Sequence, residues 1–121
     1  MKILLLVWIL IASVSPSQAG CALESTGWQK CGPGDCVQLW SGYVKCSAYV
    51  GGGISIDSNN WAYCGRGECA SESTGYIKCS PIANGGAITL GTGYVQCTDN
   101  AGKEVECEDG STDRCVDGVS P

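Results

Sequence analysis

The side chains that carry out chemistry in most enzymes are scarce in this chain. The 121-residue sequence contains no histidine, which excludes Ser–His and Cys–His nucleophile pairs and histidine-ligated catalytic metals. A serine–lysine pair stays formally open, but Lys30, Lys45 and Lys78 stand at equivalent positions of an internal repeat. A repeated position favours a structural or surface role over a single active site. We therefore predict that the protein is not an enzyme.

Two groups of carboxylates have an arrangement that suits known chemistry. Asp35 and Glu68 fill the same position of a duplicated Gly-x-Gly-acid-Cys turn, which would place two acids along one edge for glycoside hydrolysis. A solvated turn carboxylate is the favoured interpretation, because acids are common in turns. The acids after Cys97 offer oxygen ligands for calcium, but their order does not follow an EF-hand loop, so we predict a solvated acidic face. These acids are Asp99, Glu104, Glu106, Glu108, Asp109, Asp113 and Asp117.

Ten cysteines make up most of the remaining reactive side chains. A zinc site is disfavoured because the chain has no Cys-x-x-Cys and no histidine, and only two Cys-x4-Cys steps fall within zinc-ligand spacing. Five disulfides are the simpler expectation for an exported chain with few large apolar side chains. We predict no metal and no cofactor. The cysteines are Cys21, Cys31, Cys36, Cys46, Cys64, Cys69, Cys79, Cys97, Cys107 and Cys115.

The N-terminal stretch has the residue order of a secretory signal peptide, predicted at residues 1–19. A lysine precedes the apolar run from Ile3 to Ala12, and a polar stretch then ends in the small residue Ala19. The run is far shorter than the roughly 20 residues that span a bilayer, so we predict cleavage and a secreted, extracellular protein with no membrane partner. The mature chain would hold six Lys and Arg against twelve Asp and Glu. That balance argues against nucleic acid and against anionic membrane surfaces as partners.

The rest of the chain contains an internal duplication. Residues 31–47 (CGPGDCVQLWSGYVKCS) match residues 64–80 (CGRGECASESTGYIKCS) without a gap, at an offset of 33. Fixed periods of about 20 to 50 residues indicate stacked supersecondary units. The predicted divisions are a repeat array at 20–97 with duplicated units 27–59 and 60–92, and an acidic, disulfide-linked C-terminal segment at 98–121.

The spacing between cysteines predicts β-hairpins. If Cys36 faces Cys46, then Leu39 faces Tyr43, and a three-residue loop at 40–42 joins the two strands. Loops of this length favour a left-handed last residue, usually Gly and next Asn. The five predicted loops end in Gly27, Gly42, Asn60, Gly75 and Gly93. We therefore predict an all-β, small disulfide-rich repeat protein of about five stacked short β-hairpins, arranged as a solenoid or a meander.

Side-chain alternation along the strands gives each hairpin two faces. The face that carries Cys46 also carries Val44. Its counterparts are small and apolar in every hairpin but the first, where Gln29 stands, so we expect this face to be buried. The opposite face carries an aromatic residue three positions before a cysteine, edged by polar groups. These aromatic residues are Trp28, Tyr43, Trp61, Tyr76 and Tyr94.

This aromatic row is the feature best suited to recognition. Regularly spaced Trp and Tyr with a neighbouring lysine can stack sugar rings or pack against a partner, because they combine a large contact area with a polar edge. Alternatively, they lie flat over neighbouring hairpins and give the thin core its apolar cover. The candidate binding residues are Trp28, Tyr43, Lys45, Trp61, Tyr76, Lys78 and Tyr94.

One short string resembles a known family. Thr26-Gly-Trp-Gln-Lys30, echoed by Thr74-Gly-Tyr-Ile-Lys78, is similar to the Gly-aromatic hairpins of choline- and glucan-binding repeats on bacterial surfaces. The resemblance covers only these strings. Repeats of that family do not rely on cysteines and carry further aromatic positions that this chain lacks, so the chain is not assigned to it.

Facing cysteines in a hairpin are close enough to bridge. We therefore predict disulfides Cys21–Cys31, Cys36–Cys46 and Cys69–Cys79. The hairpins 54–64 and 87–97 have Ile54 and Ala87 where a first cysteine would stand, so Cys64 and Cys97 must pair outside their own hairpins. Two schemes stay open, namely Cys97–Cys107 with Cys64–Cys115, or Cys64–Cys97 with Cys107–Cys115.

Taken together, these features favour a secreted structural or assembly subunit. Stacked hairpins end in exposed sheet edges that pair with another copy unless they are blocked, and the segment after Cys97 is available to cap one such edge. A second hypothesis is an extracellular binding or adhesion module that uses the aromatic row for a glycan or a cell-surface partner. A third, a small secreted effector or enzyme inhibitor, rests only on size and disulfide content.

Overall fold

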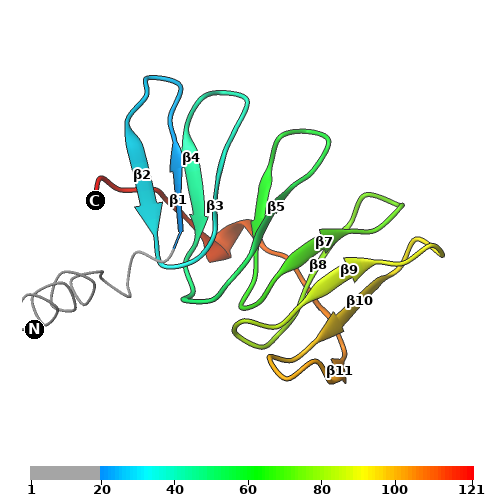
Figure 1. Cartoon of the computed structure of the whole chain (residues 1–121). Coiled ribbons are helices and arrows are strands. Elements are labelled where there is room, and N and C mark those ends of the chain that lie inside the picture. The colour runs from blue at the N-terminus through cyan, green and yellow to red at the C-terminus, as the bar shows by residue number, and fades with distance from the viewer. Residues whose placement is uncertain (1–19) are drawn as a thin grey trace, which may run out of the picture.

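The structure, a computed structural model, describes residues 20–121, and the predicted signal peptide lies outside the described residues. The fold is all-β, as predicted, and its strands pair into antiparallel hairpins that stand side by side in chain order (Figure 1). They form five separate sheets and not one continuous meander. The hairpins are β1 (Gly20–Leu23) with β2 (Gln29–Gly32), β3 (Cys36–Gln38) with β4 (Val44–Ser47), β5 (Ile54–Ile56) with β6 (Ala62–Cys64), β7 (Cys69–Ser71) with β8 (Ile77–Cys79), and β9 (Ala87–Thr89) with β10 (Val95–Thr98).

The register within the hairpins follows the cysteine spacing. Cys36 lies opposite Cys46, and in the next hairpin Ile54 lies opposite Cys64, both as predicted. A left-handed residue closes each three-residue loop, which confirms the prediction from Gly and Asn. The φ angles are 91° at Gly27, 94° at Gly42, 67° at Asn60, 98° at Gly75 and 93° at Gly93.

The core is a column of cysteines along the second strands of the hairpins. Val44, Ala62 and Ile77 are buried on the same face, which confirms the predicted buried side. These side chains are few and small, so the disulfides provide stability that a larger protein obtains from the apolar contacts of its core. The cysteines of the column, each no more than 1% exposed, are Cys31, Cys46, Cys64, Cys79 and Cys97.

Small residues directly after these cysteines allow successive hairpins to approach closely. A Cβ atom at Gly65 would overlap the side chain of Cys79 in the following hairpin. The residue directly after Cys46, and again after Cys79, is a fully buried serine whose hydroxyl links one hairpin to the next. Ser47 Oγ donates to the Gly65 carbonyl at 3.0 Å, and Ser80 Oγ donates to the Thr98 carbonyl at 2.7 Å. Hairpins one repeat apart therefore use the same contact.

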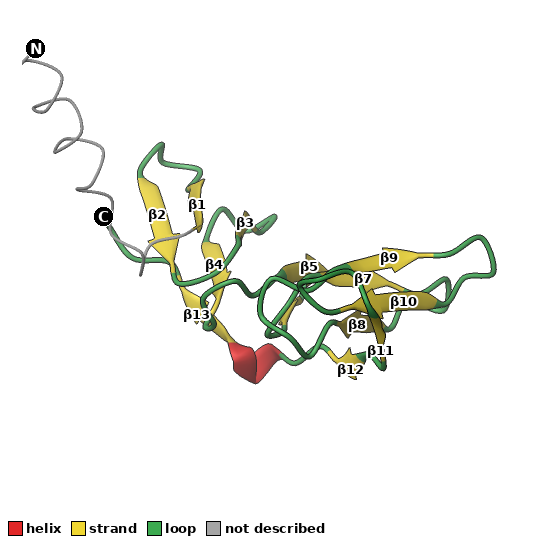
Figure 2. Cartoon of the chain, turned by 60° about the horizontal axis from the view of Figure 1, so that its bottom comes forward, coloured by secondary structure: helices red, strands yellow, loops and turns green. Residues whose placement is uncertain are grey.

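The C-terminal part of the chain runs back along the whole array as a strap, which we define as residues 104–121 (Figure 2). Within it, β11 pairs with β10, β12 with β8 and β13 with β4, and isolated bridges join Ser111 to Cys64 and Val119 to Cys31. The strap thus contacts the second strand of every hairpin, whereas the sequence suggested a cap on one edge. Its elements are β11 (Glu104–Val105), β12 (Glu108–Asp109), the 3-10 helix η1 (Thr112–Arg114) and β13 (Cys115–Asp117).

All ten cysteines form disulfides. The three hairpin disulfides, Cys21–Cys31, Cys36–Cys46 and Cys69–Cys79, are those that the facing positions predicted. Of the two open schemes the structure has Cys97–Cys107 with Cys64–Cys115. Both of these bonds join the array to the segment that follows it, so the strap is covalently fixed at two points.

The strap has a repeat of its own that matches the repeat of the array. Cys107-Glu-Asp-Gly-Ser111 and Cys115-Val-Asp-Gly-Val119 are eight residues apart in the sequence. A strap residue and the residue eight positions after it bind array residues that are 33 positions, or one repeat, apart. The disulfide partner changes from Cys97 to Cys64, the lysine bound by the aspartate from Lys78 to Lys45, and the carbonyl bound by the glycine N–H from Ile77 to Val44.

Within residues 20–121 the structure has no helix that is long and apolar enough to cross a membrane.

Candidate functional site

The aromatic row is exposed along its whole length. The exposed fractions are 70% for Trp28, 67% for Tyr43, 61% for Trp61, 72% for Tyr76 and 69% for Tyr94. These side chains therefore add little to the core, contrary to the interpretation that they cover neighbouring hairpins. Large aromatic groups held in water by a cross-linked scaffold are available for contact with a ligand.

One backbone hydrogen bond sets the position of every residue in the row. The N–H of Leu39 donates to the carbonyl of Tyr43 at 2.8 Å, across the loop that Gly42 closes. The equivalent bond holds the other four aromatic residues, at 2.7 to 3.0 Å. Each aromatic residue is thus the first residue after the left-handed loop position. Because the loop conformation recurs, the side chains leave the array at equivalent points of successive hairpins.

The loops of neighbouring hairpins also support one another. Ser25 N–H donates to the Gly42 carbonyl at 3.1 Å, and Ser73 N–H donates to the Gly93 carbonyl at 2.9 Å. The N–H of Trp40 donates to Asn60 Oδ1 at 3.1 Å. Trp40 is itself 78% exposed, so the second loop presents a further aromatic group that the sequence did not single out.

A groove lies between each pair of successive hairpins, next to the aromatic residue of the second hairpin of the pair. We name the grooves after these residues. Their volumes are about 420 Å³ for the Tyr43 groove, 340 Å³ for the Trp61 groove, 480 Å³ for the Tyr76 groove and 500 Å³ for the Tyr94 groove. Volumes of this size suit small ligands or single units of a polymer.

The strap supplies one wall of each groove. In the Tyr43 groove Lys45 Nζ forms an ion pair with Asp117 Oδ1 at 2.6 Å, and in the Tyr76 groove Lys78 donates to Asp109. The third lysine of the repeat, Lys30, donates to Ser120 Oγ at 3.3 Å. The predicted binding residues Lys45 and Lys78 are therefore held by carboxylates of the strap and do not stand as isolated cations.

These ion pairs are exposed on one side. The Lys45 and Lys78 side chains are 35% and 31% exposed, and the two aspartates are 81% and 80% exposed. The hydrogen bond to Asp109 raises the pKa of Lys78 above its ordinary value, because it stabilises the protonated amine. Each pair offers donor and acceptor groups beside an aromatic ring and carries no net charge.

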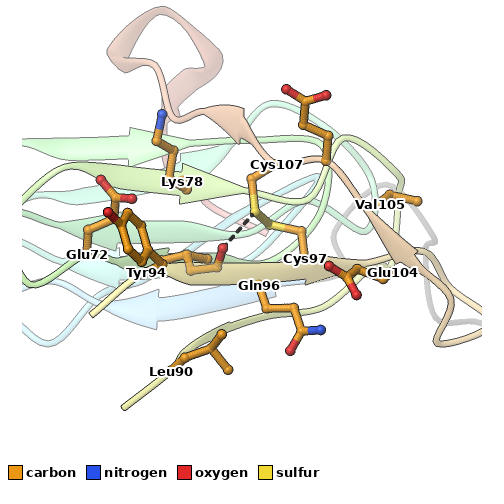
Figure 3. Close-up of a pocket in the computed structure, with 11 residues that line it drawn as sticks. Glu72, Lys78, Leu90, Tyr94, Gln96, Cys97, Glu104, Val105 and Cys107 are labelled. Carbon is orange, nitrogen blue, oxygen red and sulfur yellow. Dashed lines mark hydrogen bonds between the residues drawn. A yellow bond between two sulfur atoms is a disulfide. The ribbon is translucent and has the colours of Figure 1, made fainter. Parts of the chain in front are cut away.

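The Tyr94 groove differs in charge. In Figure 3 the Cys97–Cys107 disulfide lies at the centre of the groove, with Lys78 and Tyr94 on one side and Glu104 on the other. Glu72, Glu104 and Glu106 line it together with the one lysine, so its balance is acidic. The strand that follows Tyr94 has Gln96 where the equivalent strands have Lys45 and Lys78.

The residues that line the Trp61 groove include Trp61, two asparagines of the third loop, and Leu39 and Lys45 of the preceding hairpin. The strand after Trp61 carries Tyr63 where the equivalent strands carry lysine. The carboxylate of Asp57 raises the pKa of the Tyr63 hydroxyl, because a nearby acceptor and negative charge favour its protonated form.

The acids weighed for glycoside hydrolysis, Asp35 and Glu68, lie in the turns between hairpins. Both residues are exposed, and the backbone of each binds the next connection between hairpins. Asp35 N–H donates to the Gly52 carbonyl and Glu68 N–H to the Gly85 carbonyl, both at 3.0 Å. No group of three or more His, Cys, Asp or Glu that would suit a metal ion occurs among residues 20–121.

With this geometry in view, the chain can be compared with known proteins. No family model, curated protein or solved structure matches it. The chemistry of its surface is therefore the basis for assigning a function.

Sequence reasoning missed the contribution of the strap to the grooves. Asp109 and Asp117 were interpreted only as part of a solvated acidic face, yet each binds a lysine of the array. A signal was present, because Cys-x-Asp-Gly occurs twice, at residues 107–110 and 115–118. A repeat of eight in the tail beside a repeat of 33 in the array indicates that one segment runs along the other.

Proposed function

We propose that this protein is a non-enzymatic, secreted glycan-binding module, with the aromatic row as its contact surface. Five disulfides fit an extracellular protein, since such bonds persist in oxidising compartments. The observation that carries the proposal is the exposure of five aromatic side chains, each above 60%, at equivalent points of five hairpins. The C–H faces of sugar rings pack well against such aromatic faces.

The scaffold supports this use because it fixes the contact groups before a ligand arrives. The hairpin disulfides, the shared loop geometry and the strap hold the side chains at defined positions. Preorganisation lowers the entropic cost of binding, so shallow contacts yield more of their energy as affinity. A regular row of similar groups also suits a ligand that is itself repetitive, which favours a polysaccharide over the irregular surface of a protein.

Charge narrows the class of glycan. Residues 20–121 contain six Lys and Arg against twelve Asp and Glu. Long-range repulsion would oppose sulfated or carboxylated polymers, whose binding requires clustered cations. The proposed ligand is therefore an uncharged polysaccharide.

A second candidate function is assembly into a larger extracellular structure. It is favoured by apolar side chains on the terminal hairpins, since Leu23 in β1 is 59% exposed and Ile88 in β9 is 60% exposed. The strap disfavours assembly through the second strands of the hairpins, because it covers the edges of those strands. Sedimentation velocity with electron microscopy tests this candidate, and a strictly monomeric protein at high concentration would argue against it.

Retention on insoluble polysaccharides tests the binding function. The panel is cellulose, chitin and curdlan as uncharged polymers, with pectate as a carboxylated one. We expect retention of the wild-type protein on at least one uncharged polymer, and loss of that retention when Trp28, Tyr43 and Trp61 are all replaced by alanine. Because these side chains are exposed, the triple variant should unfold at the same temperature as the wild type.

The matched control is Leu23→Ala, which removes an apolar group of similar exposure that lies outside the row. It should leave retention unchanged. Unchanged retention of the triple variant, or absence of retention on every polymer, would refute the proposed function.

A further inference from the structure

The Tyr43 and Tyr76 grooves share one set of array and strap residues, although the preceding hairpin adds Glu24 to the first and Tyr63 to the second. In each groove the array contributes a tyrosine, the apolar residue after it and then a lysine, at positions 43–45 and 76–78. The strap contributes Asp-Gly, at 117–118 to the first groove and 109–110 to the second. Array and strap therefore repeat in step, and both halves of the site recur together.

The strap glycines show how closely this match is built. The N–H of Gly118 donates to the Val44 carbonyl at 3.0 Å, and the N–H of Gly110 donates to the Ile77 carbonyl at 2.9 Å. A Cβ atom at Gly118 would lie 2.9 Å from Val44 Cγ1, and one at Gly110 would lie 3.0 Å from Ile77 Cγ2. Only glycine fits these gaps without displacement of its neighbours. The backbone thus places the preceding aspartate, and with it the acceptor beside each lysine.

The other two grooves lack the full set, because Lys45 and Lys78 reach them from the preceding hairpin but, within residues 20–121, no strap aspartate lines either groove. The hairpin of Trp61 has Tyr63 at the lysine position, and the hairpin of Tyr94 has Gln96 there. The strap residues at the Tyr94 groove include Glu104 and Glu106, neither of which forms an ion pair among the described residues. A neutral donor–acceptor pair next to an exposed tyrosine therefore occurs twice, one repeat apart.

We propose that the Tyr43 and Tyr76 grooves are two equivalent subsites that bind separate stretches of one uncharged polysaccharide chain. This inference rests on the proposed glycan-binding function and names the positions and the ligand class that carry it. The tyrosine ring packs against the C–H face of a sugar ring. The lysine ammonium donates to a hydroxyl oxygen, and the aspartate carboxylate accepts from a hydroxyl group. Asp109 and Asp117 determine specificity, since they cancel the lysine charge that would otherwise attract anionic sugars.

Two subsites on one rigid array have a measurable consequence. When a polymer occupies one subsite, its second contact becomes intramolecular, and the gain reaches roughly 10²- to 10⁴-fold over a single contact when the geometry fits. A short oligosaccharide that fills only one subsite gains nothing from this effect. The polymer should therefore bind at least tenfold more tightly than the oligosaccharide, and two oligosaccharides should bind per chain.

Titration calorimetry with the disaccharide of the retaining polymer measures this number directly. We expect two bound molecules for the wild type, one for Tyr43→Ala, one for Tyr76→Ala and none for the double variant. Each single variant should also lose at least tenfold in affinity for the soluble polymer. Ile88→Ala is the matched control, because it removes an apolar side chain of similar exposure, 60%, from β9 of the neighbouring hairpin and lies outside the aromatic row. It should still bind two.

The role of the two aspartates is tested by substitution with asparagine, which removes the negative charge and keeps the shape of the side chain. Asp109→Asn with Asp117→Asn leaves Lys45 and Lys78 without their counter-charge. We expect weaker binding of the uncharged polymer and new, salt-sensitive retention on pectate. Thermal unfolding is measured in parallel, and an unchanged preference for uncharged polymers would overturn the assigned role of the aspartates.

The outcomes separate this inference from the proposed function. A stoichiometry of one for the wild type, or a stoichiometry that Tyr43→Ala and Tyr76→Ala leave unchanged, overturns the two subsites while the aromatic row stays the binding surface. Retention on pectate alone by the wild type also overturns the ligand class but leaves a glycan-binding module. Retention on none of the polymers overturns both.

Discussion

Removal of the Cys64–Cys115 disulfide perturbs the strap in a way whose size can be worked out. This bond joins residues 51 positions apart, whereas Cys97–Cys107 joins residues 10 apart. In the chain-entropy model, closure of about 50 residues stabilises the fold by about 4 kcal/mol at 25 °C, and closure of about 10 residues by about 2.7 kcal/mol. Two other disulfides lie inside the longer loop and shorten it in the unfolded chain, which lowers the first figure to about 3.7 kcal/mol.

The two disulfides form a matched pair for experiment. Cys64 and Cys97 are buried to the same degree, with 0% and 1% of their surface exposed, and Cys115 and Cys107 are both half-buried. Replacement of each pair by alanine therefore removes similar contacts, and the cavity contributions largely cancel. What remains is the difference in loop closure, about 1 kcal/mol in favour of the longer loop.

Guanidinium unfolding followed by far-ultraviolet circular dichroism measures the free energies. We expect the Cys64/Cys115 variant to lose about 1 kcal/mol more than the Cys97/Cys107 variant. Peptide mapping under non-reducing conditions should show the other four disulfides unchanged in each variant. Equal losses, or a larger loss from the shorter loop, would refute the view that the long crosslink stabilises the array through the strap.

Two further predictions concern packing and pH. Gly65→Ala places a methyl group against the Cys79 side chain and should destabilise the fold by about 1–3 kcal/mol. The control Gly91→Ala, with open space around its Cβ, should change the midpoint of thermal unfolding little. Equal midpoints for the two variants would contradict the hairpin contact. The raised pKa of Lys78 implies stability that is present below the ordinary lysine value of 10.5 and is lost as pH rises through the higher pKa of the folded state. The stability difference between wild type and Asp109→Asn should therefore shrink above about pH 10.5 in thermal unfolding across pH 8–12, and a constant difference would show that this ion pair does not titrate as the structure implies.

The hairpins could be predicted because their determinants are local. A ten-residue step between Cys36 and Cys46 with a glycine at the loop position leaves one register in which the cysteines face each other. The five loop-closing residues pointed to the same conformation, and all five have positive φ. Side-chain alternation then separated the buried face of Val44 from the exposed face of Tyr43.

The strap could not be placed by the same reasoning, because its contacts join residues distant in the sequence. Nothing local to Cys115 indicates that its partner is Cys64 and not Cys107, so two disulfide schemes stayed open. The aspartates resembled a solvated acidic tail for the same reason. Only the comparison of two periods, eight in the strap and 33 in the array, relates Asp117 to Lys45.

The grooves follow from the strap and were therefore also beyond the sequence prediction. The aromatic residues were identified as candidates, but their exposure depends on how closely the hairpins stack. That spacing is set by Gly65, Ser47 and their counterparts, whose side-chain size matters only once the hairpins meet.

The central claim is that a ligand contacts the aromatic row and not another face of the molecule. An NMR titration of the isotope-labelled protein with the hexasaccharide of a retained, uncharged polymer tests it most directly. The account predicts that ring signals of Tyr43 and Tyr76 shift with saturation, together with amides of Gly110 and Gly118, while signals of the inter-hairpin turns stay in place. Shifts confined to the turns around Asp35 and Glu68, or no shifts at all, would contradict it.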